Sequence, residues 1–282
     1  MRSKVTIQTL REKMAKGQPI TMITGYDYPM ALLEERAGID IILVGDSLGM
    51  TILGYDSTLP VTMDVMVEHC KAVRRGAPTA YVIGDMPYMS YQVSVEEAVR
   101  NAGRFMKEAG VDAVKLEGGR NVVDVVEALT KATIPVMGHL GLTPQSMAML
   151  GGFKAQGRDI QAAEAIINDA KAIEEAGAVS ILLEAVPPEV AKVITDRAGI
   201  PIISIGAGPH CHGQLLIVHD MLGFFDAFTP KFVKKYANLN SIILDALQQY
   251  RQDVENRVFP SDEHCYKMQA DALAKFKEKY GD

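Results

Sequence analysis

The sequence is poor in cysteine and has no long apolar run. Its 282 residues include three cysteines, Cys70, Cys211 and Cys265, which are scattered and show no CxxC spacing. This usage predicts a reduced, cytoplasmic compartment rather than a disulfide framework. The first twenty residues lack the apolar core of a secretory signal, and no run approaches the length of a transmembrane helix. We therefore expect no membrane partner.

Clustered basic charge is also missing. Lysine and arginine total 29 against 35 aspartates and glutamates, and the formal net charge is −6. The two signs are interspersed, so no basic face for a nucleic acid is expected. With 48% hydrophobic and 23% charged residues, the composition is that of a globular protein that buries a large core. Small molecules are the expected partners.

A repeated pattern organises the chain. The segments EERAGIDIILVGDS, MKEAGVDAVKLEGG, IEEAGAVSILLEAV and TDRAGIPIISIGAG share a charged helical end, an Ala-Gly pair and a short apolar run. Their glycines, Gly38, Gly110, Gly177 and Gly199, suit the left-handed position that closes a helix. Continuous apolar runs are typical of parallel strands covered on both faces. The pattern predicts strands at 20–27, 39–47, 79–87, 112–119, 134–141, 179–186, 200–208 and, more weakly, 215–222.

Helical patterns separate most of these strands. Ser94 and Glu97 have the spacing of a capping box, and residues 159–177 carry apolar side chains at helical intervals. Eight strands that alternate with helices predict an α/β fold with one domain, residues 1–282, shaped as a (β/α)8 TIM barrel. A doubly wound open sheet is the alternative.

Three segments do not follow the repeat. A helix at about 6–17 is expected before the first strand, and a C-terminal helical tail at about 261–280 is expected to pack on the barrel or on a neighbouring subunit. The connection at 142–159 is long for a loop between a strand and a helix. Long loops in compact domains are usually functional or disordered, so we expect a mobile lid there.

Polar residues gather at the carboxyl ends of the predicted strands, where parallel α/β folds bind ligands. They are Asp46, Ser47, Asp85, Lys115, Glu117, His139 and Glu184. Gathered carboxylates repel one another unless a proton or a cation lies among them. Oxygen ligands without cysteine suit Mg²⁺ better than zinc. The alternative for Asp46 and Asp85 is a role as helix caps.

Other features of this set also leave alternatives open. Lys115 and Glu117 are two residues apart and share one face of a strand, where they line the site or form an internal salt bridge. Glu184 ends the apolar run SILLEAV, a setting that suits a general base, unless it is a surface acid beyond the strand.

The run GPHCHGQ at 208–214 places three potential ligands side by side. Three consecutive residues cannot all face one ion, so no transition-metal site is expected.

The chain resembles the ketopantoate (3-methyl-2-oxobutanoate) hydroxymethyltransferase family. The resemblance rests on VGDSLGM, GHLGLTPQS and further stretches between about residues 20 and 260. It implies a (β/α)8 barrel with one Mg²⁺ per subunit that transfers the one-carbon unit of 5,10-methylenetetrahydrofolate to 3-methyl-2-oxobutanoate, in the first committed step of pantothenate synthesis. It also implies a homo-oligomer, typically of ten subunits.

The resemblance implies roles for the residues at the strand ends. Asp46 and Asp85 match Mg²⁺ ligands, and Glu117 belongs to the same metal site, directly or through water. Asp46, Ser47, Asp85 and Lys115 match the positions that contact the substrate.

The proton acceptor of the family matches Glu184. His139 is placed as an outer donor or as a structural histidine. One departure is His212, which stands where the family usually has an acid before Gly-Gln and bears on the local loop and its pH dependence.

Two rival functions remain. A Mg²⁺-dependent α-keto-acid lyase or mutase of the isocitrate lyase and phosphoenolpyruvate mutase type would also place carboxylates at strand ends, although the lyase-type cysteine motif is not seen. A barrel without catalytic activity would have lost some of these acids, whereas all of them are present.

Overall fold

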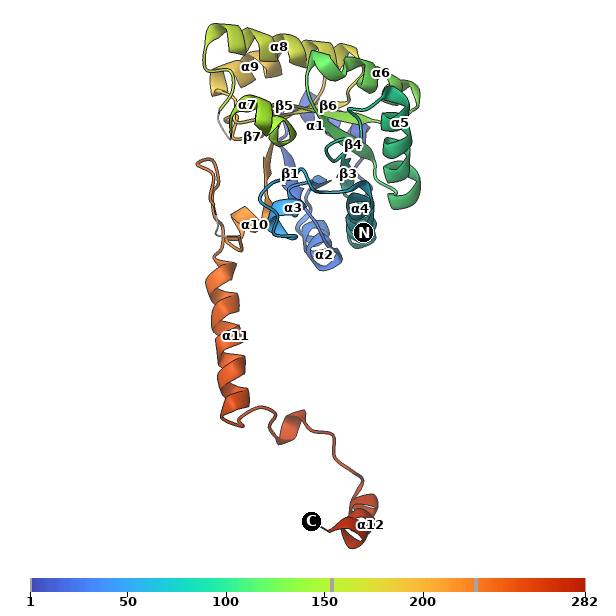
Figure 1. The fold of residues 1–282 in the computed structure, drawn as a ribbon, viewed down its shortest axis with the longest axis vertical. Helices are drawn as coiled ribbons and strands as arrows, with labels where there is room; N and C mark the ends of the chain where they lie inside the picture. The colour runs from blue at the N-terminus through green and yellow to red at the C-terminus, as the bar shows by residue number, and fades with distance from the viewer. Residues whose placement is uncertain (1, 153–154, 226–227, 282) are drawn as a thin grey trace.

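The fold is a closed barrel of eight parallel strands. The computed structural model describes residues 2–152, 155–225 and 228–281. Each strand pairs with its neighbour in sequence, and β8 pairs with β1 to close the ring (Figure 1). The strands are β1 (Ile20–Thr24), β2 (Ile41–Val44), β3 (Tyr81–Asp85), β4 (Ala113–Glu117), β5 (Val136–Gly141), β6 (Ser180–Glu184), β7 (Ile202–Ile205) and β8 (Gly213–Leu216). The predicted TIM barrel is confirmed, and the open sheet is excluded.

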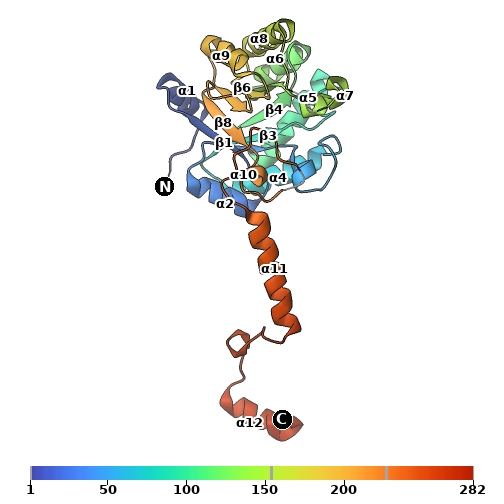
Figure 2. The same ribbon diagram turned by 90° about the vertical axis from the view of Figure 1, so that its left-hand side faces the viewer.

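Helices cover most of the outer surface of the barrel (Figures 1 and 2). The longer ones are α2 (Tyr28–Ala37), α4 (Met63–Gly76), α5 (Val95–Arg104) with the π-helical turn η1 (Phe105–Ala109), α6 (Val123–Lys131), α8 (Ile160–Glu175) and α9 (Pro188–Arg197). Short turns are α3 (Leu48–Thr51), η2 (Arg120–Val122), η3 (Pro144–Ser146), α7 (Met147–Leu150) and α10 (Val218–Met221). Residues 206–212, all described, join β7 to β8 without a helix.

Two apolar cores flank the sheet. In β2, Ile41 and Leu43 point into the barrel, whereas Ile42 and Val44 point outward to the helices. Because both faces of the strand are buried, its apolar run is continuous rather than alternating. The inner core also includes Leu10 of α1 (Ile7–Ala15), so the N-terminal helix contributes to the barrel interior. The helix predicted at 6–17 is confirmed.

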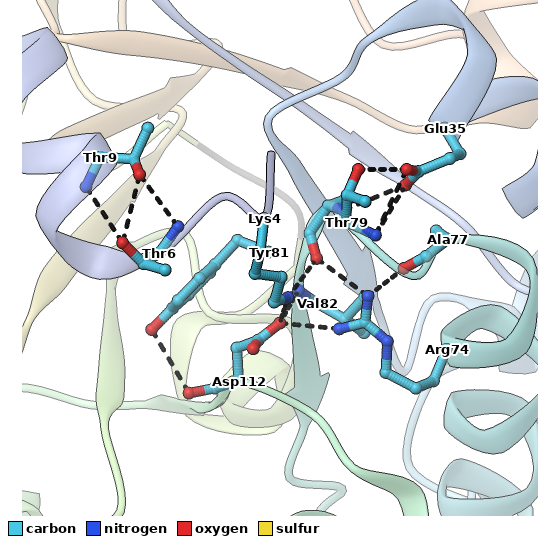
Figure 3. Close-up of polar contacts among 11 residues, drawn as sticks. Lys4, Thr6, Thr9, Glu35, Arg74, Ala77, Thr79, Tyr81, Val82 and Asp112 are labelled. Atoms are coloured by element: carbon cyan, nitrogen blue, oxygen red, sulfur yellow. Dashed lines mark hydrogen bonds and ion pairs between the residues drawn. The ribbon is translucent and has the colours of Figure 1, made fainter. Parts of the chain in front are cut away.

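A polar network joins helices to the amino-terminal ends of the strands (Figure 3). The carboxylate of Asp112 accepts hydrogen bonds from Lys4 Nζ (2.5 Å), Arg74 Nη1 (2.8 Å) and the Val82 amide (2.8 Å). Glu35 of α2 accepts backbone N–H groups just before β3. This end of a TIM barrel usually serves stability, and the opposite end is left for chemistry.

The eighth strand differs from its prediction at 215–222. Gly213 pairs with Ile20 of β1 and with Ile203 of β7, which sets the start of β8 two residues earlier. The strand ends at Leu216, and Val218–Met221 form the helical turn α10. The apolar composition of LLIVHDML therefore does not extend the strand, because pairing ends where the chain turns over the barrel mouth.

Most predicted helix ends are confirmed. Ser94 accepts the amide of Glu97 at 3.1 Å as the N-cap of α5. Gly38, Gly110 and Gly177 have φ values of 76°, 65° and 100°, as the left-handed position requires. Gly199 does not have a positive φ, so that prediction is wrong. Helix α9 ends instead at Ala198, whose backbone is extended.

The C-terminal segment leaves the barrel after α10. Helix α11 (Leu239–Glu255) projects away from it, and α12 (Ala270–Tyr280) lies farther out (Figures 1 and 2). Neither helix has a buried residue. The helical tail predicted at 261–280 is continuous only over α12, after a 3-10 turn at Asp262–His264, and α11 was not predicted. The single-domain organisation stays a prediction.

Two further points concern the surface segments. The predicted lid at 142–159 contains η3 and α7, and its residues 153–154 lie outside the described part of the chain. Among the helices of the described ranges, none combines the length and the apolar character that are needed to cross a bilayer.

Candidate active site

Strand register brings the predicted polar residues to the mouth of the barrel. Asp85 of β3 pairs with Lys115 of β4, and Glu117 pairs with His139 of β5. Because side chains alternate along a strand, these residues continue the inward faces that bury apolar side chains deeper in the barrel. Together with Glu184 they line a cavity of about 310 Å³. The whole predicted set, Asp46, Ser47, Asp85, Lys115, Glu117, His139 and Glu184, lines this cavity.

Lys115 and Asp85 form a buried ion pair at the centre of the set. Lys115 Nζ lies 2.5 Å from Asp85 Oδ1 and 3.9 Å from Glu117 Oε1, and the Lys115 and Asp85 side chains are only 3% and 2% exposed. Burial opposes the charge of the lysine, but the surrounding carboxylates outweigh it and raise the pKa of Lys115. Burial raises the pKa of Asp85 despite the lysine. Lys115 therefore forms an internal salt bridge and also lines the cavity, and its role in an active site stays a prediction.

Asp46 reaches the set through its backbone as well as its side chain. Its amide donates to Asp85 Oδ2 at 3.1 Å, and its Oδ2 accepts the side-chain amide of Gln145 at 2.9 Å. No side chain caps α3, the next helix, so Asp46 is not a helix cap. Burial and the charge of Asp85 raise the pKa of Asp46 well above its usual range. An added cation would relieve this repulsion.

His139 lies between two carboxylates. Its Nδ1 is 3.4 Å from Glu117 Oε1, and its Nε2 is 3.1 Å from Glu184 Oε2. Neither ring nitrogen meets the geometry of a hydrogen bond with a described residue. Burial and Lys115 oppose a charged imidazole, but the two carboxylates outweigh them and raise the pKa of His139 to about 9. Burial likewise opposes a charged Glu117, yet His139 and Lys115 lower its pKa. His139 thus links the lysine-centred cluster to Glu184.

The two Gly-Asp segments place their glycines for different reasons. A Cβ atom on Gly45 would lie 2.8 Å from Ser47 Oγ, whereas a Cβ on Gly84 would lie 2.6 Å from the ring of Phe105. The first glycine leaves room for the serine hydroxyl, which lies 2.7 Å from the hydroxyl of Tyr26. The second admits the ring of Phe105 against the outside of β3. Ser47 is therefore oriented at the cavity by a buried tyrosine.

Gln145 is a site residue that sequence reasoning assigned only to the lid. Its backbone amide donates to Glu117 Oε2 at 2.9 Å, and its side-chain amide donates to Asp46. Its side-chain oxygen accepts the hydroxyl of Tyr91 at 2.7 Å. Gln145 is buried and therefore fixes two acids rather than moving with a lid. Its place directly after β5 was the available signal.

The donor set fits Mg²⁺ better than a metal that needs many protein ligands. Within the described ranges, no three or more His, Cys, Asp or Glu side chains are arranged to hold a metal ion. Mg²⁺ is commonly held by one or two carboxylates, with waters and substrate oxygens completing its coordination. Asp46 and Asp85 offer such a pair, and burial, together with the repulsion of neighbouring carboxylates, raises the pKa of each.

Comparisons with known proteins identify the family of the chain. The family model for ketopantoate hydroxymethyltransferase matches residues 4–262. The 3-methyl-2-oxobutanoate hydroxymethyltransferase of Syntrophus aciditrophicus is 57% identical over 93% of this chain and 97% of its own. That of Moorella thermoacetica is 56% identical over 94% and 99%. The resemblance found in the sequence is thereby confirmed.

Solved structures with low sequence identity share the fold. Phosphonopyruvate hydrolase in complex with oxalate and Mg²⁺ gives a TM-score of 0.60 at 15% identity, over 98% of this chain and 99% of that one. A 2,3-dimethylmalate lyase gives 0.58 at 15% identity, over 97% and 95%. These likenesses support the barrel alone.

His212, the departure from the family pattern, has a structural contact outside the cavity. Its Nδ1 accepts the backbone amide of Ile202 at 3.0 Å, at the start of β7. Accepting this bond requires an unprotonated Nδ1. Burial lowers the pKa of His212 below the ordinary histidine value. The histidine therefore takes part in the β7–β8 connection rather than in the acid cluster.

The stability of this connection should depend on pH. Because the folded pKa of His212 is lowered, its contribution is complete above the unfolded value of about 6.5 and is lost as the pH falls through the lower folded value. The variant His212→Asn keeps an acceptor oxygen that does not titrate. Urea unfolding between about pH 8 and pH 5 should show a smaller loss of stability in this variant than in the wild type. His210→Asn, on the same loop but exposed, is the control, and equal pH slopes in all three proteins would contradict the prediction.

Proposed function

Because the chain belongs to the ketopantoate hydroxymethyltransferase family, we propose that it transfers the one-carbon unit of 5,10-methylenetetrahydrofolate to 3-methyl-2-oxobutanoate and forms 2-dehydropantoate (ketopantoate). This is the first committed step of pantothenate synthesis. The observation that carries the proposal is the acid cluster around Lys115, which opens into one cavity together with Glu184. The reaction requires removal of a proton from the carbon beside the ketone, and this carbon then forms a bond to the folate methylene carbon. Both bonds from the methylene carbon to the folate nitrogens break, water supplies the oxygen of the new hydroxymethyl group, and tetrahydrofolate is released.

Asp46 and Asp85 would hold one Mg²⁺, with Glu117 in the same site, directly or through water. When bound, Mg²⁺ would act as a Lewis acid toward the keto oxygen of the substrate. Asp46 and Asp85 are buried close together, and the charge of Lys115 compensates their negative charge only in part. Gln145 holds Asp46 and Glu117 in place through its side chain and its backbone.

Lys115 and Ser47 would orient the ketoacid. The lysine is held by Asp85 and Glu117, so its position is fixed before the substrate arrives, and its charge offsets that of the substrate carboxylate. The hydroxyl of Ser47 is held by Tyr26 and would hydrogen-bond the substrate. Such fixed groups lower the entropic cost of reaching the reactive geometry.

Glu184 would remove the proton. Its side chain is 16% exposed, more than the 2–3% of Asp85, Lys115 and His139, so it lies nearest to the open part of the cavity. One of its carboxylate oxygens, Oε2, lies 3.1 Å from His139 Nε2. The other oxygen is left for the substrate, which suits a general base.

The rival reaction is that of a Mg²⁺-dependent α-keto-acid lyase or mutase. Barrels of that class share the fold, but at 15% identity the likeness carries no chemistry. The two reactions are separated by supplying 3-methyl-2-oxobutanoate with and without methylenetetrahydrofolate. Hydroxymethyl transfer consumes both compounds, whereas a lyase or mutase does not need the folate.

We also propose that the protein is a homo-oligomer, a decamer by resemblance. In this assembly, α11 and the C-terminal tail at about 261–280 pack on a neighbouring subunit. Helix α11 carries the exposed apolar residues Ile243, Leu247, Tyr250 and Val254 at helical spacing. A helix with a regular apolar face is normally buried against another surface.

The three cysteines are free, which supports placement in the reducing cytoplasm.

The variant Glu184→Gln should remove the base without changing the volume of the side chain. We expect kcat to fall about 10²–10⁴-fold, while Mg²⁺-dependent binding of the ketoacid is largely retained. Exchange of deuterium from solvent into 3-methyl-2-oxobutanoate, followed by NMR without folate, should be lost as well. Glu189→Gln, on the exposed first turn of α9, is the matched control. Near-normal turnover of Glu184→Gln would remove it as the base.

The variant Asp46→Asn should weaken metal-dependent binding. We expect the affinity for the ketoacid in the presence of Mg²⁺ to fall by at least about tenfold, since loss of an outer partner alone typically costs 10–100-fold. Calorimetry with and without Mg²⁺ measures this. Asp64→Asn, on the exposed side of α4, should bind like the wild type. Wild-type binding that is the same with and without Mg²⁺ would show that the metal assignment is wrong.

The variant Leu247→Asp should disrupt the proposed subunit contact, because a charge on the apolar face of α11 cannot be buried without a partner. We expect light scattering to show a smaller particle than for the wild type, with the circular dichroism of a folded barrel. Gln248→Asp adds the same charge to the neighbouring position and should leave the assembly intact. A wild-type protein that is monomeric in solution contradicts the proposal.

A further inference from the structure

One buried carboxyl at the barrel mouth has no part in the chemistry above. Asp220 lies in α10, four residues after the end of β8, is 5% exposed and lines the same cavity as Glu184. Its side chain accepts no hydrogen bond from any residue in the described ranges. Its oxygens are not among the fully buried polar atoms without a partner, so they are open to the cavity that Asp220 lines, where a donor on a ligand can reach them.

The surroundings of Asp220 act on its pKa in opposite directions. Burial raises its pKa to about 6, and Lys235 opposes the shift. On the side of β1 it faces Tyr26, whose own pKa it helps to raise, and the hydroxyl of that tyrosine is engaged with Ser47. Asp220 therefore lines the cavity with carboxyl oxygens that accept from no described residue.

The cavity wall on this side is apolar. It is formed by Ile205, Ile217, Phe225, Pro230 and Phe232, from the ends of β7 and β8 and the segment that follows α10. Lys231 also lines the cavity, is exposed, and forms no ion pair with a described residue. Around the closed ring, β8 lies four strands from β4, which carries Lys115 and Glu117. The cavity thus has an apolar region at β7, β8 and the segment after α10, in addition to the acid cluster around Lys115.

We propose that Asp220, the apolar wall and Lys231 form the binding subsite for the folate co-substrate. The Asp220 carboxylate accepts the ring N–H and the amino group on the 2-amino-4-oxopyrimidine edge of the pterin, the wall holds the ring, and Lys231 pairs with the carboxylates of the glutamate tail. The assignment rests on the proposed function and adds the part of the site that the acid cluster cannot supply.

The chemistry of the ligand matches this arrangement. The pyrimidine edge presents two neighbouring N–H donors, a fork of the kind that a carboxylate accepts with both oxygens. A flat aromatic ring suits an apolar wall with phenylalanine side chains. The tail ends in carboxylates, which the acid cluster would repel and an unpaired lysine at the rim attracts. A folate bound in this region would share one cavity with a ketoacid bound at the acid cluster.

The variant Asp220→Asn tests the pterin contact, because it replaces one acceptor oxygen with a donor at constant size. We expect the Kd of tetrahydrofolate, measured by calorimetry, to rise about tenfold or more, as for loss of hydrogen bonds to a charged group. The KM for methylenetetrahydrofolate should rise in parallel. Asp196→Asn, on the surface of α9, is the control.

The variant Lys231→Gln tests the tail contact with a second probe. Tetrahydrofolate should bind a few-fold more weakly, in a salt-dependent manner, whereas 6-methyltetrahydropterin, which has no glutamate tail, should bind as it does to the wild type. Asp220→Asn should weaken both probes. Lys234→Gln, three residues along and absent from the cavity lining, is the matched control.

The outcomes separate the two proposals. If the wild type neither binds tetrahydrofolate nor forms ketopantoate, the proposed function fails. If the wild type is active and Asp220→Asn binds both probes normally, the subsite is overturned. Deuterium exchange into the ketoacid without folate should be similar in Asp220→Asn and the wild type. An equal loss of exchange and folate binding would assign Asp220 a structural role and would also overturn the proposal.

Discussion

The buried ion pair between Lys115 and Asp85 is the contact on which the catalytic end of the barrel depends. Its 2.5 Å separation lies within a cluster that also contains Asp46 and Glu117. Loss of one partner from a buried pair leaves an uncompensated charge and typically costs about 3–5 kcal/mol. Two cationic side chains, Lys115 and His139, face four carboxyl groups, those of Asp46, Asp85, Glu117 and Glu184, however. The same contact that makes the cluster possible therefore leaves it short of positive charge, which is the condition under which a divalent cation binds.

Much of this cluster could be predicted from the sequence, because successive side chains along a strand point alternately inward and outward. Asp85, Lys115, Glu117, His139 and Glu184 all continue an inward face at a strand end, so the placement of the strands was sufficient to bring them together. Pairwise register was not available from the sequence. The link from Glu117 through His139 to Glu184 depends on it, since these three residues come from successive strands.

The residues that the sequence did not predict lie in turns beyond the strand ends, where the alternation of side chains along a strand gives no information. Gln145 follows β5 in a 3-10 turn, and its contacts with two acids depend on the path of that turn. Asp220 fell inside the strand predicted at 215–222, where it had no distinct position. In the structure β8 ends at Leu216, and the turn of α10 carries Asp220 over the cavity. An error of a few residues in one strand end thus concealed a carboxyl at the barrel mouth.

The two Gly-Asp segments look alike in sequence, but each aspartate reaches the site by a different route. Asp85 is still within β3 and follows its inward face, whereas Asp46 lies two residues beyond β2 and is turned into the mouth by its own backbone. The Asp46 amide donates a hydrogen bond to the Asp85 carboxylate and so connects the two aspartates directly. It makes Asp85 an acceptor for both a lysine and a backbone amide, so the position of each aspartate depends on the other. A metal held by both carboxylates would therefore bind to a pair whose geometry the barrel has already set.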